Sequence, residues 1–108
     1  VVKDLFFVAK IRETARLAGV PVRFVKTPDE VAAEAPEGAR FALLDLTAGF
    51  DYQAIFTSLE FHRVPVLGFT THVLARQTQP WHPRCDRVVT KEILTEELPA
   101  LLREGIAA

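Results

Sequence analysis

The chain has 108 residues, enough for one domain, and we expect a single domain over residues 1–108. A composition with 49% hydrophobic and 25% charged residues excludes a disordered chain and is typical of a folded globular protein. The formal net charge of −1 provides no basic excess, so we expect no nucleic-acid partner.

The first part of the chain alternates short apolar runs with amphipathic stretches. We expect the tail of a buried strand at residues 1–2, a helix over residues 5–18 and a short strand over residues 21–25. A second short helix follows, because Thr27 can cap it and Glu30, three residues later, completes a capping box.

The second part continues the same alternation of strand and helix. Its expected strands are residues 41–46, 64–69 and 87–90, and its expected helices are residues 51–61, 71–79 and 95–104. We expect Asp51 to cap the helix over residues 51–61, and Pro99 to lie near the first turn of the last helix, where proline costs least.

Five strands and five helices in strict alternation indicate an α/β domain. Because crossovers between parallel strands are right-handed, we expect a doubly wound five-stranded parallel sheet with helices on both faces. Ligands of such sheets bind outside the carboxyl ends of the strands. The candidate site residues at these ends are Lys3, Asp4, Asp45, Thr47, Thr70, Thr71 and Lys91.

Four segments of the chain follow one another as in a known family. The segments are VVKD (1–4), FALLDLTAG (41–49), PVLGFTT (65–71) and CDRVVTK (85–91). In order and spacing, the sequence resembles the receiver domains of bacterial response regulators (the CheY-like family) over nearly its whole length. The resemblance implies a flavodoxin-like fold with strand order 2-1-3-4-5 and a role in two-component signal transduction.

The resemblance also implies roles for individual residues. Asp45 falls at the phospho-acceptor position, and Asp4 is the remaining member of the acidic pair. Together with the carbonyl of Thr47 they would hold Mg²⁺, which prefers oxygen ligands. Thr70 falls at the switch hydroxyl position, where its neighbour Thr71 could substitute for it.

Two positions depart from the family pattern. Lys3 stands where the family has the second acid, so it removes one anionic ligand and adds a repelling charge near any metal ion. Thr90 stands at the family's lysine position, and Lys91 follows one residue later. We therefore expect a degenerate receiver in which phosphorylation is lost or atypical and Lys3 contacts a carboxylate directly.

Several of these residues also have a purely structural interpretation. Asp4 can cap the first helix, Thr70 and Thr71 can cap the fourth, and Asp45 can be a buried acid that is satisfied by its neighbours. Trp81 would lie on the partner-binding face of a receiver, or it folds back to cover the edge of the sheet.

The function we expect is that of a non-catalytic signalling module that binds another signalling protein, or forms a homodimer through its last two helices. One alternative is a working phospho-acceptor that uses Asp45 with Mg²⁺. A second is a small flavodoxin-like domain that binds an anion or a nucleotide, although no glycine-rich loop follows the first strand. We do not expect an enzyme, because no nucleophile–base pair stands outside the receiver set.

The location that we expect is the cytoplasm. Cys85 is the single cysteine, which excludes an internal disulfide and fits a reducing compartment. No apolar run reaches the roughly 18 residues of a membrane span, and no signal peptide is visible, so we expect no membrane association. No methionine occurs, even at position 1, and we expect the sequence to start at a processed or truncated position.

Overall fold

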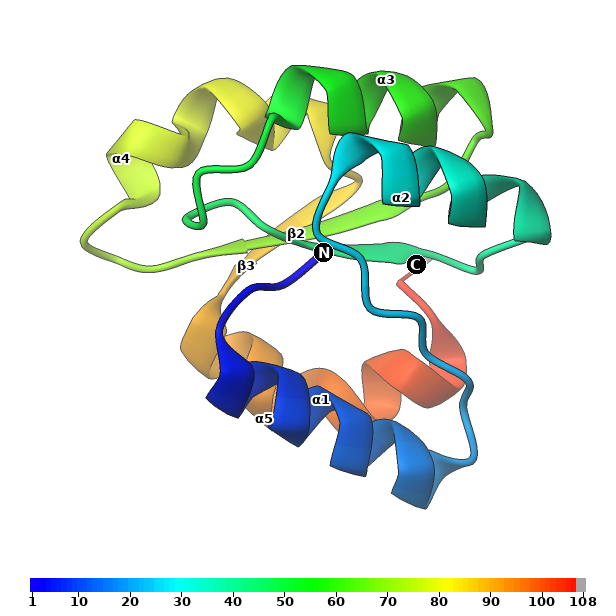
Figure 1. Ribbon diagram of the computed structural model, residues 1–108. Helices are drawn as coiled ribbons and strands as arrows, with labels where there is room; N and C mark the ends of the chain where they lie inside the picture. The colour runs from blue at the N-terminus through cyan, green and yellow to red at the C-terminus, as the bar shows by residue number, and fades with distance from the viewer. Residues whose placement is uncertain (107–108) are drawn as a thin grey trace.

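A three-stranded parallel β-sheet lies between two layers of helices in the computed structural model, which describes residues 1–106 (Figure 1). The strands are β1 (Ala42–Asp45), β2 (Val66–Thr70) and β3 (Arg87–Thr90). The helices are α1 (Leu5–Ala18), α2 (Pro28–Glu34), α3 (Tyr52–Phe61), α4 (Ala75–Thr78) and α5 (Lys91–Glu104). Two 3₁₀ helices, η1 (Ala35–Glu37) and η2 (Gln79–Arg84), follow α2 and α4.

The prediction of a five-stranded sheet is wrong, because the described residues form three strands in the order β1-β2-β3. These are the third, fourth and fifth of the predicted strands. All are parallel, and Leu44 lies opposite Gly68, which lies opposite Val88. Helices cover both faces of the sheet, as the alternation of elements predicts.

The two missing strands have different causes. Val1 lies beside β1, since its nitrogen donates to the oxygen of Leu43 at 2.6 Å and its oxygen accepts from the amide of Asp45 at 3.1 Å, but this pairing is too short to form a strand. Residues 21–25 form no ladder, and a groove of about 1070 Å³ is lined by this segment on one side and by β1 on the other. A strand needs a partner edge, and this segment reaches none.

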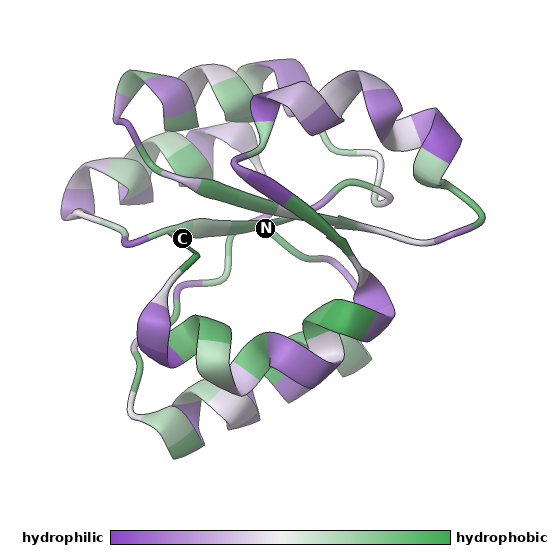
Figure 2. Cartoon of the chain, turned by 180° about the vertical axis from the view of Figure 1, so that it is seen from behind, coloured by the Kyte–Doolittle hydropathy of each residue, from purple (hydrophilic) through white to green (hydrophobic). Residues whose placement is uncertain are grey.

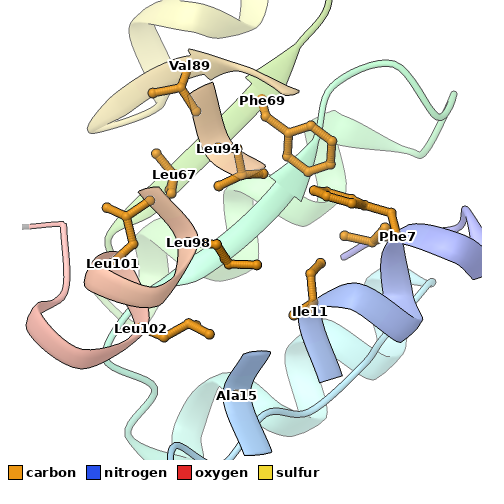
Figure 3. Close-up of a cluster of buried hydrophobic side chains, with 11 residues drawn as sticks. Phe7, Ile11, Ala15, Leu67, Phe69, Val89, Leu94, Leu98, Leu101 and Leu102 are labelled. Atoms are coloured by element: carbon orange, nitrogen blue, oxygen red, sulfur yellow. The ribbon is translucent and has the colours of Figure 1, made fainter. Parts of the chain in front are cut away.

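The lower helical layer in Figure 1 consists of α1 and α5, which lie side by side. Their inward side chains recur at helical spacing and pack on one face of the sheet (Figure 3). The buried members of this core cluster are Val2, Phe7, Ile11, Ala15, Leu67, Phe69, Val89, Leu94, Leu98, Leu101 and Leu102.

The upper layer consists of α2, α3, α4 and η2. A second core cluster joins it to the other face of the sheet, with Ile55, Phe56 and Leu59 of α3 fully or almost fully buried. The strands are mostly hydrophobic, while each helix carries hydrophilic residues as well (Figure 2). A central sheet with apolar side chains on both faces is what a doubly covered parallel sheet requires.

Helix ends show which local signals the sequence carries. Thr27 caps α2 and Asp51 caps α3, as predicted. The predicted start of the last helix is wrong: α5 begins at Lys91, because the hydroxyl of Thr90 accepts a hydrogen bond from the amide of Ile93. Pro99 consequently lies inside this helix rather than in its first turn.

The predicted helix over residues 71–79 is also longer than the observed one. Only Ala75–Thr78 is α-helical, and the 3₁₀ helix η2 continues it through Pro80 and Pro83. Proline removes a backbone donor, and the tighter 3₁₀ turn tolerates this better than a long α-helix does. Within residues 1–106, no helix combines the length and the apolar character that crossing a membrane requires.

Candidate functional site

A pocket of about 350 Å³ lies at the carboxyl ends of the strands, where sequence analysis predicts the site. It is lined by Lys3, Asp4, Asp45, Thr47, Ala48, Phe69, Thr71 and Lys91. The fold thus brings together most of the predicted site residues from four separate parts of the chain. Thr70 and the predicted partner-binding residue Trp81 do not line this pocket.

Asp45 is the last residue of β1 and is only 7% exposed. Its Oδ1 accepts a hydrogen bond from the amide of Thr47 at 2.8 Å and another from the Thr47 hydroxyl at 2.6 Å. Thr47 therefore acts here through its amide and its hydroxyl. These bonds offset part of the cost of burying a carboxylate and hold Asp45 in one orientation toward the pocket.

Tyr52, the first residue of α3, organises the loop that follows β1. Its hydroxyl donates to the backbone carbonyl oxygen of Asp45 at 2.8 Å and accepts from the amides of Ala48 at 3.1 Å and Gly49 at 3.2 Å. Burial raises the pKa of Tyr52 above its ordinary value. Sequence reasoning missed this residue, and its position directly after a capping aspartate was the available signal.

Asp4 serves as the N-cap of α1. Its Oδ1 accepts from the amides of Phe6 at 2.9 Å and Phe7 at 3.2 Å, and its Oδ2 lies 3.5 Å from the Nζ of Lys91. The Phe7 amide, followed by the Phe6 amide and Lys91, lowers the pKa of Asp4, and partial desolvation opposes this. Both carboxylate oxygens of Asp4 are therefore already engaged.

Two ammonium groups reach the same pocket. Lys91 lies over the ring of Phe7, with Nζ 4.9 Å from the ring centroid, in addition to its contact with Asp4. Lys3 donates to the carbonyl oxygen of Ala48 at 3.2 Å and lies 5.5 Å from the ring centroid of Phe50. The expectation that Lys3 contacts a carboxylate is wrong, because among the residues described its ammonium lies within 4 Å of none.

The two threonines after β2 take different positions. Thr70 is buried, and its hydroxyl accepts from the hydroxyl of Thr78 at 3.0 Å; Thr78 in turn lies 2.8 Å from Nε2 of His82. Thr71 lines the pocket and accepts from the amide of Leu74 at 3.2 Å. The neighbour of the predicted switch residue is thus the one that faces the site.

Trp81 lies in η2 and is half-buried against the upper layer. Its ring stacks on Phe56 at a centroid distance of 5.8 Å and contacts Tyr52 at 5.5 Å. Arg84 covers Phe56 as well, with its guanidinium 4.9 Å from the ring centroid, and pairs with Glu60 at 2.9 Å. Trp81 therefore contributes to packing, and its role in partner binding stays a prediction.

The donor set of the pocket does not fit Mg²⁺. Of the two carboxylates that line the pocket, Asp4 uses one oxygen to accept from helix amides and the other to pair with Lys91, and Oδ1 of Asp45 already accepts two hydrogen bonds from Thr47. Two ammonium groups share the same small volume. Mg²⁺ requires near-octahedral oxygen ligands and is repelled by such charges, so we derive no chemical step through it.

Comparisons of the chain with protein-family models, with curated proteins and with solved structures found no match.

Proposed function

We propose that this chain is a signalling module related to receiver domains, which acts by contact with another protein and in which phosphorylation is lost or atypical. The observation that carries the proposal is the pocket at the strand ends. It joins Asp45, Thr71 and Lys91, three of the residue types that receiver chemistry uses, while Asp4 is committed to capping and ion pairing.

Charge explains why phosphorylation would be lost. Transfer of a phosphoryl group to a carboxylate needs a cation that neutralises the moving oxygens and is itself held by several acids. Here Lys3 stands at the position that the resemblance gives to one such acid, and its ammonium donates to the carbonyl oxygen of Ala48. An ammonium that lines the pocket supplies positive charge whether or not a metal ion or a phosphoryl group is bound, so we expect the pocket to favour one conformation over switching.

The test is the intact mass of the protein after incubation with acetyl phosphate, with and without Mg²⁺. We expect no phosphoryl gain in the native chain. The Lys3→Asp variant restores the second acid and should gain one phosphoryl group in the presence of Mg²⁺. The Lys3→Asp/Asp45→Asn double variant should lose that gain, because Asp45 is the acceptor.

The outcomes separate three interpretations. A phosphoryl gain in the native chain that Asp45→Asn abolishes would identify a working phospho-acceptor and overturn the loss of phosphorylation. No gain in the native chain and none in Lys3→Asp would withdraw support for a relationship to receivers. Lys3→Ala is the matched control, because it removes the ammonium without adding a ligand.

A further inference from the structure

The outer face of the layer formed by α1 and α5 carries large exposed apolar side chains. Phe6 is 92% exposed and Leu17 is 72% exposed, and both lie on α1. Spacings of four, three and four residues place Phe6, Lys10, Glu13 and Leu17 along one stripe of this helix. No other described element covers this face, since α1 and α5 form the lower layer by themselves (Figures 1 and 2).

The two helices of this layer carry opposite charge. Helix α1 has three basic residues and one acidic residue, a net of +2, and α5 has two basic and four acidic residues, a net of −2. Within residues 1–106, none of the ion pairs engages Lys10, Glu92 or Glu96. All three are exposed, so their charges are available to a partner.

The helices run in the same direction. Asp4 at the start of α1 pairs with Lys91 at the start of α5, and Ala18 and Leu102 line one groove at the other end. Lys10 lies six residues after Asp4, and Glu96 lies five residues after Lys91. Both helices rise about 1.5 Å per residue, so the two positions lie at similar distances along the helices from the Asp4–Lys91 pair. The two side chains therefore stand at nearly the same height in the layer.

A two-fold axis can bring two such layers face to face in two ways. An axis perpendicular to the helices places α1 against α1 of the other copy, which opposes like charges. An axis parallel to the helices places α1 against α5 of the other copy at the same height. The interface then contains two equivalent α1–α5 contacts, and each brings a helix of net charge +2 against a helix of net charge −2. Like charges placed opposite each other are disfavoured, so charge selects the second arrangement.

We propose that the partner fitted by this face is a second copy of the chain, bound through a parallel α1–α5 contact in which Phe6 and Leu17 are covered and Lys10 meets Glu96. This interface replaces the last two helices as the dimer face, because α4 is only four residues long. The proposal goes beyond the proposed function: it involves neither Mg²⁺ nor Asp45, so failure of one test leaves the other intact.

The experiment is sedimentation equilibrium of the full chain over a range of protein and salt concentrations. The native chain should form a dimer that weakens as salt rises, because exposed charges are screened. Lys10→Glu should raise the dissociation constant about tenfold or more, since it places like charges together at two symmetric positions. Lys10→Glu combined with Glu96→Lys should restore most of the affinity.

Phe6→Ser should also raise the dissociation constant about tenfold or more, because it removes the largest apolar side chain of the proposed interface and aromatic side chains often carry much of an interface's affinity. Phe61→Ser is the matched control: Phe61 ends α3 in the opposite layer and is 81% exposed, so its loss should change nothing. A monomer at every concentration would overturn the proposal. So would a dimer that Phe61→Ser dissociates and that Phe6→Ser and Lys10→Glu leave intact.

Discussion

The two aspartates of the pocket have similar sequence contexts but different tasks. Asp4 comes after Val1, Val2 and Lys3 and is exposed; it holds the first turn of α1 and pairs with Lys91. Asp45 ends a buried strand and is held by Thr47. Asparagine can replace an exposed aspartate that caps a helix, because it keeps the cap and removes only the charge. Asp4 is therefore the better of the two residues for a test of electrostatics.

Replacement of Asp4 with Asn should remove a pH-dependent part of the stability. The folded state lowers the pKa of Asp4 below its ordinary 3.8, so the carboxylate stabilises the fold above that value, and this contribution is lost as pH falls through the lowered pKa. Asparagine still caps the helix but carries no charge. Urea unfolding between about pH 6 and pH 2 should show that the native chain loses more stability than Asp4→Asn in this range.

If the difference in unfolding free energy between the native chain and Asp4→Asn stays constant over this pH range, that result would contradict the capping and ion-pair contacts of Asp4. The single tryptophan, Trp81, packs against α3 and gives the fluorescence signal for these measurements.

At this scale the sequence indicates residue types better than their partners. Asp4, Asp45 and Lys91 reach one pocket, as strand ends in a parallel sheet should. The hydrogen bond from Lys3 to the carbonyl oxygen of Ala48 could not be predicted, because the position of this carbonyl depends on the path of the loop after β1. That path is fixed by Tyr52, whose hydroxyl binds three backbone groups across the loop.

Strand β2 is the element on which both layers depend, and Gly68 lies at its centre. A Cβ at this position would stand 2.7 Å from Sγ of Cys85 and 3.0 Å from Cδ1 of Leu46. Gly68→Ala should therefore destabilise the fold by about 1–3 kcal/mol, the usual cost of overpacking a core. Urea unfolding of the variant against the native chain measures this cost.

The sulfur is the closer obstacle, so Cys85→Ala should recover part of the loss in a double-mutant cycle. The recovery should be incomplete, because Leu46 still crowds the new methyl group. If Gly68→Ala costs the same with and without the sulfur, then Cys85 is not what excludes a side chain from this position.

Elements with local signals were predictable, and those that depend on distant partners were not. Helix α1 has periodic apolar residues and ends at a glycine, and the predicted helix over residues 5–18 has the same bounds as the observed one. Residues 21–25 have the composition of a strand, but a strand forms only where a segment reaches the edge of a sheet and pairs with it. Composition alone does not show whether a segment reaches that edge. The start of α5 was missed because Thr90 is both the last strand residue and the helix cap.

The whole molecule is built outward from one strand. All five residues of β2 are buried, and β2 pairs on both sides, whereas β1 has a groove along much of its outer edge. The alternation of strands and helices predicts a sheet with two covered faces, and this is what forms. The number of strands was overestimated because alternation does not show which segments reach the sheet.

Hydrogen exchange should show this gradient directly. Strand β2 pairs with β1 and β3, the amide of Val66 donates to the carboxylate of Asp86, and all five residues are buried, so the amides of β2 should exchange only through global unfolding. Among the described residues, the amides of residues 22–25 make no hydrogen bond to backbone or side chain, and they should exchange faster by a factor on the order of 10³ or more. Peptide-level exchange followed by mass spectrometry separates the two segments. Equal protection in both would mean that residues 22–25 pair as a strand in solution.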